Sequence, residues 1–226
     1  MSLSAIQIKT ALYLQGIKLA LAFCKVNQLP APEFMTYVEL MDSKKESHSI
    51  RFARKVMPDA RLVGAHTGLY HQSEDGDGII FVNVGVTALP TRTPGHRRWS
   101  WPCWKTDRTA VGVVAHEMGH HVDEVLLAGR LNPSRCGEWL HALKGRKVTS
   151  YEPVPSEALA ETMRLFILNP ELLQLGLPQR YRFIRDVLKL KPSERRGWTT
   201  VLGHNPHYIA AGERWIGEAK RQKDVC

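Results

Sequence analysis

Cysteine is scarce in this chain, and the cysteines that occur are isolated from one another. The sequence of 226 residues has four of them, none in a C-x-x-C pair: Cys24, Cys103, Cys136 and Cys226. This spacing excludes a disulfide-stapled scaffold and a cysteine-based zinc ribbon. Long apolar runs are also lacking, since none reaches the ~18 residues that a membrane-spanning helix needs. With 43% hydrophobic and 23% charged residues, the composition is typical of a folded domain with one sizeable core.

Negative charge is in short supply, with 22 acidic against 31 basic residues and a formal net charge of +9. Such a balance is typical of proteins with an acidic partner, and the basic residues concentrate in two segments, 92–108 and 180–196. The sign reverses at 151–176, which has four acidic residues and one basic residue. Because carboxylates bind cations, this acidic segment is the first place to look for a metal ligand.

The N-terminal segment 4–26 is rich in apolar side chains, but Lys9, Gln15 and Lys18 interrupt them. A secretory signal needs an uninterrupted apolar stretch and a small-residue cleavage site, so we expect no clear signal peptide. The apolar residues recur at helical spacing and predict an amphipathic helix that packs on the domain. We therefore expect a cytoplasmic protein without a transmembrane segment.

Predicted strands precede most of the predicted helices, which favours an α+β fold. The β-branched segments 60–70 and 79–86 flank the acidic turn 73–78 and predict a hairpin. Apolar periodicity and breakers place the helices at 4–26, 33–45, 49–56, 106–128, 134–145, 155–168, 178–190 and 206–222. We expect one domain with an N-terminal helical part, a sheet and loop, and a second helical part, at 1–58, 59–105 and 106–226.

One motif carries metal chemistry: the segment 111–121 reads VGVVAHEMGHH and contains His-Glu-x-x-His on a predicted helix. His116 and His120 are four residues apart, so their imidazoles project from one helical face, about 6 Å apart. That spacing lets two ring nitrogens reach one Zn²⁺ at about 2.0–2.1 Å. Glu117 is turned roughly 100° from His116 and can accept a proton from the metal-bound water as general base. The alternative is a helix with two hydrogen-bonded histidines and no metal.

A catalytic zinc needs a third protein ligand. A further histidine six residues after His120, as in metzincins, is excluded because that position is Leu126. The other option is a carboxylate from a later helix, and the acidic segment offers Glu157 and Glu161, again four residues apart on one face. Glu157 can then bind the metal while Glu161 accepts the free ring N–H of a zinc-bound histidine, which fixes the tautomer.

Two segments together, HEMGHHVDEVLLAG at 116–129 and YEPVPSEALAETMRLF at 151–166, resemble the gluzincin metallopeptidases and, within them, the lethal-factor type of catalytic domain. The resemblance implies a zincin-like fold, one catalytic Zn²⁺ and endopeptidase activity. It also implies that Glu157 is the third ligand and that Glu161 supports the ligand shell. Tyr151 then lies near the site, where its hydroxyl stabilises the oxyanion.

The resemblance also bears on substrate binding, because gluzincins usually place an edge strand above the metal helix, where a peptide substrate pairs with it. By that reasoning 79–86 is the best candidate, with Asn83 reaching the substrate backbone; a plain core strand is the other interpretation. Asp123, three residues after His120, either orients that ring or is a surface acid. His121 points away from His120 and is expected on the surface or in a second layer.

Two other functions stay open on the sequence alone. The loop 96–105 interleaves basic and aromatic residues, which is typical of single-stranded nucleic-acid binding and of an active-site rim. The first alternative is therefore a non-proteolytic binding or assembly protein, virion- or DNA-associated, with a retained metal site. Intact Glu117 argues against it, because a structural site needs no general base. The second alternative is a metal hydrolase with a non-peptide substrate.

The segment LFILNPELL at 165–173 more loosely resembles a stretch of metallopeptidase-like proteins from phages and prophages. That resemblance implies a phage-encoded protein in the cytoplasm of a bacterial host or in the virion. His204 and His207 lie in a late turn, and either one covers the active site or both are structural.

Overall fold

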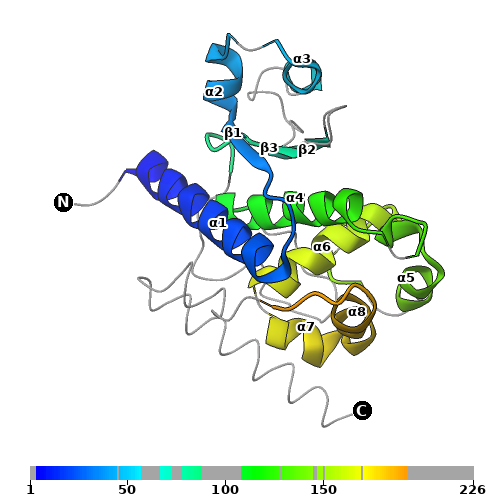
Figure 1. Cartoon of the computed structure of the whole chain (residues 1–226). Coiled ribbons are helices and arrows are strands. Elements are labelled where there is room, and N and C mark those ends of the chain that lie inside the picture. The colour runs from blue at the N-terminus through cyan, green and yellow to red at the C-terminus, as the bar shows by residue number, and fades with distance from the viewer. Residues whose placement is uncertain are drawn as a thin grey trace.

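The computed structural model describes residues 4–44, 46–56, 67–72, 78–87, 108–127, 129–144, 147–149, 151–168 and 170–192. They form a mixed α/β arrangement, mostly helical, with one small three-stranded mixed sheet (Figure 1). Several predicted features lie outside these residues: the basic loop 96–105, Cys103, the helix 206–222, His204 and His207. Among the described helices, none is both long and apolar enough to cross a membrane.

Helix α1 (Ala5–Asn27) confirms the predicted N-terminal helix and lies along α4 (Ala110–Val125). Ser4 begins α1 with a capping box, in which its hydroxyl and a first-turn glutamine satisfy each other's backbone N–H groups. Gly16 allows the two helices to come close, because a Cβ at this position would lie 3.0 Å from the Cβ of Val114. The apolar face of α1 is therefore part of the main core, as its periodicity predicts.

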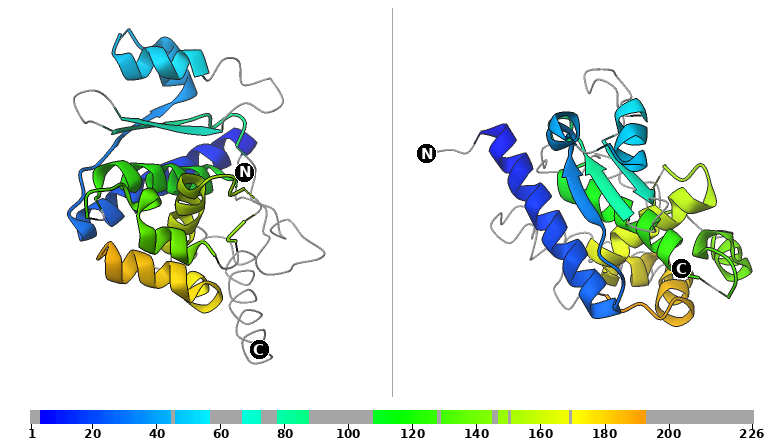
Figure 2. Two further views of the ribbon diagram at one scale, coloured as in Figure 1. Left: turned by 90° about the vertical axis from the view of Figure 1, so that its right-hand side faces the viewer. Right: turned by 45° about the horizontal axis from the view of Figure 1, so that its top comes forward.

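The sheet has the strand order β1-β3-β2, with β1 at Glu33–Thr36, β2 at Gly68–Gln72 and β3 at Gly78–Val82. β3 is parallel to β1 and antiparallel to β2, which confirms the antiparallel pairing that the sequence predicts. β2 overlaps only the end of the strand predicted at 60–70, and 60–66 and the turn residues 73–77 lie outside the described residues. All five residues of β3 are buried. The sheet lies between α4 on one face and the pair α2 (Tyr37–Asp42) and α3 (His48–Val56) on the other (Figure 2).

The side chains of β3 alternate between these two faces, as they must in a strand. Ile80 and Val82 belong to the main core with α1, α4 and α6, whereas Ile79 and Phe81 belong to a second apolar cluster with α2 and α3. β3 thus joins the two layers of the molecule and holds the sheet against α4.

Two sequence predictions for this region are wrong. The helix predicted at 33–45 begins with a strand, because pairing of β1 with β3 outweighs the local helical pattern, and only α2 remains helical. The strand predicted at 79–86 ends at Val82 and turns back, since Val86 donates to the carbonyl of Asn83. That strand is also central rather than at the edge, so a substrate cannot pair with it.

The C-terminal half of the described chain is helical, and α6 (Pro155–Leu168) has the bounds that the sequence predicts. α6 packs against α4, which starts at its N-cap Thr109. The helices predicted at 134–145 and 178–190 are each divided into two shorter elements. In order, the remaining elements are η1 (Pro133–Arg135), α5 (Gly137–Ala142), α7 (Pro170–Gly176), α8 (Pro178–Arg182) and the π-helical turn η2 (Phe183–Val187).

Candidate metal centre

The His-Glu-x-x-His motif occupies the middle of α4, a helix that is buried on nearly all sides. Its first ten residues are all buried, which explains why the sequence before the motif is apolar and small. His116 and His120 project from the same face, with ring centroids 5.1 Å apart. The helical spacing therefore places the two imidazoles as the sequence predicts.

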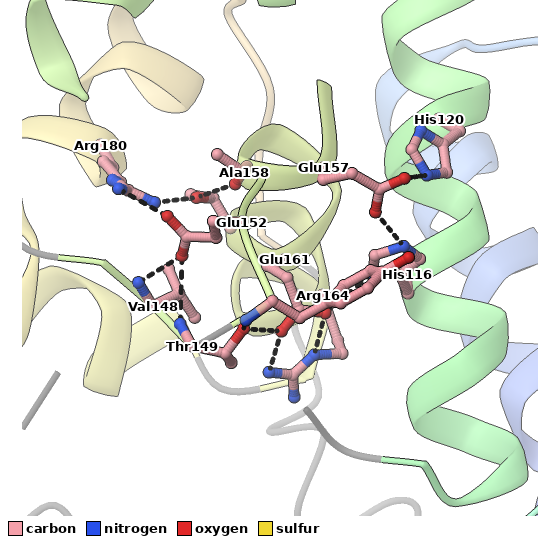
Figure 3. A network of polar contacts seen from close by, with 12 residues as sticks. His116, His120, Val148, Thr149, Glu152, Glu157, Ala158, Glu161, Arg164 and Arg180 are labelled. Atoms are coloured by element: carbon pink, nitrogen blue, oxygen red, sulfur yellow. Dashed lines mark hydrogen bonds and ion pairs between the residues drawn. The ribbon is translucent and has the colours of Figure 1, made fainter. Parts of the chain in front are cut away.

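Glu157, in the first turn of α6, meets both histidines (Figure 3). Its Oε2 atom lies 3.2 Å from Nε2 of His116, and its Oε1 atom lies 3.6 Å from Nε2 of His120. The three candidate ligand atoms are all within 4.8 Å of one another, so this group could hold a metal ion. The residues identified from two separate i,i+4 patterns thus come together across the α4–α6 contact.

The chemistry of these donors fits a cation. Nδ1 of His116 lies 2.8 Å from Oε1 of the buried Glu161, which favours a proton on Nδ1 and leaves a lone pair on Nε2. That lone pair faces Oε2 of Glu157, a buried oxygen without a hydrogen-bond partner in the described part of the chain. Two lone pairs at this distance repel unless a positive charge lies between them. A metal ion or a second proton on His116 supplies that charge.

The titration of these groups points the same way. Burial alone would lower the pKa of His116, but the neighbouring carboxylates of Glu157 and Glu161 raise it to about 10. Burial would likewise raise the pKa of Glu157, but His116 and His120 lower it to about 2. In the absence of a metal, these pKa values favour a proton shared between His116 and Glu157.

Glu161 is fully buried and is the hub of the polar network behind the ligands (Figure 3). Besides His116, its carboxylate accepts from Oγ1 of Thr149 at 2.6 Å and from the guanidinium of Arg164 at 3.1 and 3.2 Å. Burial raises the pKa of Glu161, but Arg164 and His116 lower it to about 2. The contact of Arg164 with Glu161 could be predicted from the sequence, because the two residues follow each other at helical spacing. The contact of Thr149 could not, because Thr149 is in a separate segment.

Glu117 stands apart from the ligand group, against strand β2. A Cβ at Gly68 would lie 2.6 Å from Oε1 of Glu117, so the strand leaves room for this carboxylate by lacking a side chain. Burial raises the pKa of Glu117, while His116, His120 and a hydrogen bond from the Tyr70 backbone lower it, with the net shift upward. Glu117 is thus a buried acid beside the candidate ligands, and its role as general base stays a prediction.

The ligands lie at the edge of an open cavity of about 830 Å³. β2 forms one wall, and the start of α6 and the η1 region form others. Tyr151 lines the cavity with 44% of its surface exposed, and its ring centroid is 6.0 Å from that of His116. Arg108, which sequence reasoning did not single out, also lines it.

The other predicted site residues have different surroundings. Oδ1 of Asp123 accepts from the backbone N–H of Ser134 at 2.7 Å, so this carboxylate holds the η1 turn beside the cavity; its role in orienting His120 stays a prediction. Asn83 is buried at the end of β3 and is not among the residues that line the cavity. His121 is buried rather than on the surface, and its Nε2 atom lies 2.8 Å from the carbonyl oxygen of Pro30.

Comparisons of the chain with family models, with curated proteins and with solved structures returned no match. The class of site is therefore defined by the side chains themselves. They form a His/His/carboxylate group on two packed helices, with a buried acid and a phenol at the same cavity.

Proposed function

We propose that this chain is a zinc-dependent endopeptidase of the gluzincin type, with a zincin-like fold. The observation that carries the proposal is the convergence of His116, His120 and Glu157, whose ligand atoms lie within 4.8 Å of one another beside the buried Glu117. Two imidazoles and one carboxylate are a donor set of hydrolytic zinc sites, which keep a further coordination position open. The resemblance of both motifs to gluzincins supports the same class.

In this proposal His116, His120 and Glu157 hold the ion. Zn²⁺, when bound, lowers the pKa of water toward about 7 and polarises a carbonyl group. Glu117 accepts a proton from the attacking water and passes it to the leaving nitrogen. Burial raises the pKa of Glu117, which makes this carboxylate a stronger base than an exposed glutamate. The hydroxyl of Tyr151 donates to the carbonyl oxygen as negative charge develops there.

The position of β2 supports a peptide as the substrate. β2 is an outer strand of the sheet, and in the described part of the chain it pairs with β3 alone. Residues 68–70 of β2, with Thr67 before them, form part of the cavity wall. An extended peptide can add to such a strand and run past the ligands. We therefore assign to β2 the substrate-pairing role that the sequence analysis expects of 79–86.

The test separates metal binding from catalysis. Metal analysis of the purified protein is expected to show one zinc per chain, and His116→Ala and Glu157→Ala are expected to lose it. Glu117→Gln is expected to keep the zinc and lose at least about 10²-fold in peptide cleavage, because the general base is gone. His141→Ala, an exposed histidine on α5, is the control that changes neither quantity. Full zinc retention in both ligand variants would overturn the proposal.

A second candidate is a non-proteolytic binding protein on the same scaffold, favoured by the formal net charge of +9. Its distinguishing result is DNA or heparin binding that survives Glu117→Gln, together with no cleavage of a broad peptide library. Cleavage that depends on Glu117 excludes it.

A further inference from the structure

A buried ion pair lies behind the candidate metal centre, away from the cavity. It joins Glu152, in the segment that precedes α6, to Arg180 of α8, with Oε2 of Glu152 3.0 Å from Nη2 of Arg180. Each side chain is only 2% exposed. Taking two charges out of water is costly, and a buried pair is often no more stabilising than apolar residues of the same volume. Stability alone therefore gives no account of its presence.

The contacts of Glu152 show what the pair does to the chain around it. Its Oε1 atom accepts from the backbone N–H groups of Val148 and Thr149, the latter at 3.1 Å. Its neighbour Tyr151 lines the cavity. One carboxylate thus holds the backbone at Val148 and Thr149, close in the chain to a cavity residue.

Arg180 in turn holds Glu152 in one place. Its Nη1 atom donates to Oγ1 of Thr162 on α6 at 3.2 Å, and its guanidinium carbon lies 5.6 Å from the centroid of the Trp139 ring. The planar guanidinium therefore has fixed neighbours on α5 and α6 as well as its ionic partner. Arginine suits such a position better than lysine, because its fork can bond in two directions at once.

Thr149 connects the ion pair to the candidate metal ligands. Its Oγ1 atom donates to Oε2 of Glu161 at 2.6 Å and accepts from the backbone N–H of Tyr151 at 3.1 Å. Glu161 in turn lies 2.8 Å from Nδ1 of His116. A chain of polar contacts thus runs from Arg180 through Glu152, Thr149 and Glu161 to His116 (Figure 3).

We propose that the Glu152–Arg180 pair positions the metal centre: it fixes the backbone at Val148 and Thr149 so that Thr149 orients Glu161 and Tyr151 faces the cavity. Both residues are positioning residues that touch neither metal nor substrate. The inference rests on the proposed function for the identity of the site. A purely structural pair would hold α8 to α6 and leave the candidate ligands unaffected. The experiment must therefore measure metal binding and ligand geometry directly.

The first measurement uses metal alone, without substrate. Co²⁺ is titrated into the metal-free full-length chain, the visible spectrum reports the ligand geometry, and Zn²⁺ affinity follows from competition with a chelator. Thr149→Val is expected to lower Zn²⁺ affinity by about 10- to 100-fold, the usual effect of losing a partner behind a ligand, and Thr149→Ser is expected to restore it. Glu152→Gln and Arg180→Lys are expected to change the Co²⁺ spectrum and lower the affinity by a smaller factor.

The control is Arg185→Lys, an exposed arginine on η2 paired to Asp186, which is expected to leave spectrum and affinity unchanged. Circular dichroism identifies any variant that does not fold. If Glu152→Gln does not fold, the milder change Arg180→Lys is used in its place. If the unaltered chain binds no Co²⁺ or Zn²⁺, the proposed function fails. If it binds both while folded Glu152→Gln and Arg180→Lys match it in spectrum and affinity, the positioning role fails alone.

The second measurement tests the effect on Tyr151. Glu152→Gln is combined with Tyr151→Phe, and kcat and KM for a peptide are measured for the four members of the cycle. Positioning predicts that Tyr151→Phe lowers kcat less in the Glu152→Gln background than in the unaltered chain, because the phenol is already displaced. Additive effects on kcat would show that Glu152 does not act through Tyr151.

Discussion

His116 has the most informative surroundings of any residue at the site, because its ring lies between two carboxylates. Burial alone would lower its pKa, but Glu157 and Glu161 raise it to about 10, so at neutral pH the metal-free ring carries a second proton. A metal must displace this proton from Nε2, since only the neutral ring binds. We predict that zinc binding at pH 7 releases about one proton from His116. Affinity then falls about tenfold for each pH unit below pKa 10.

Isothermal titration calorimetry in two buffers with different ionisation enthalpies measures this proton release. The result that contradicts the prediction is an observed enthalpy that does not change with the buffer. In that case the neutral ring already has its lone pair free before the metal arrives.

Gly68 gives a second test at the scale of one residue. A Cβ there would lie 2.6 Å from Oε1 of Glu117 and 2.5 Å from Cγ1 of Val113, so Gly68→Ala must push the carboxylate aside. We predict a loss of peptidase kcat with retention of zinc, because Glu117 is not a ligand. Gly137→Ala is the matched control, since a Cβ at that glycine meets nothing within 4 Å. Loss of zinc in Gly68→Ala would show that the strand supports the ligands rather than the base.

Sequence spacing was enough to predict the residues of the site that share one helix. Both i,i+4 pairs, on α4 and on α6, were visible, and the structure brings them together. Thr149, Gly68 and Arg180 were not predictable, because each meets the site from a segment whose local sequence has no metal-binding pattern. Their roles depend on tertiary contacts alone.

At the scale of elements, the contact between α4 and α6 decides whether the ligands meet. Gly119 lies at this contact, and a Cβ there would be 2.4 Å from Cα and 3.0 Å from the carbonyl oxygen of Ala160. Both of those atoms are backbone, so the helices must separate to accept a side chain. We predict that Gly119→Ala lowers the free energy of unfolding by about 1–3 kcal/mol, the usual cost of overpacking.

The same variant should bind zinc more weakly, because His116 and Glu157 are on opposite sides of the widened contact. Urea unfolding of the metal-free chain and chelator competition measure the two effects. Unchanged zinc affinity in a destabilised Gly119→Ala would mean that Glu157 follows α4 when the helices separate.

Helices were more predictable than strands in this chain. α6 was predicted residue for residue because Pro155 opens it and its apolar face repeats at helical spacing. β1 was mistaken for helix because 33–36 is short, and its partner β3 is more than 40 residues away. The central position of β3 was hidden for the same reason, since strand order depends on a parallel neighbour that no local pattern reveals.

At the scale of the whole molecule, the candidate ligands join two helices that belong to the main core. Metal bound to the folded chain alone stabilises it by RT ln(1 + [L]/Kd), about 2.7 kcal/mol at a hundredfold excess over Kd. We predict that a chelator lowers the melting temperature of the zinc-loaded chain, and that His116→Ala abolishes the difference between zinc and chelator. Equal melting temperatures for the zinc-loaded and metal-free chain would contradict a site that spans α4 and α6.

His121 and its neighbour His120 are adjacent in α4, so their side chains leave the helix about 100° apart. His121 is clamped behind the helix, between the carbonyl of Pro30 at 2.8 Å and the hydroxyl of Tyr70 at 3.4 Å. A rotation of α4 about its long axis would move His116 and His120 away from Glu157, and it would also break these two contacts of His121. The contacts of the buried His121 imidazole resist rotation of α4 about its axis, and so help to fix the direction in which His116 and His120 project. The placement of His116 and His120 therefore depends partly on the contacts of His121 on another side of the same helix.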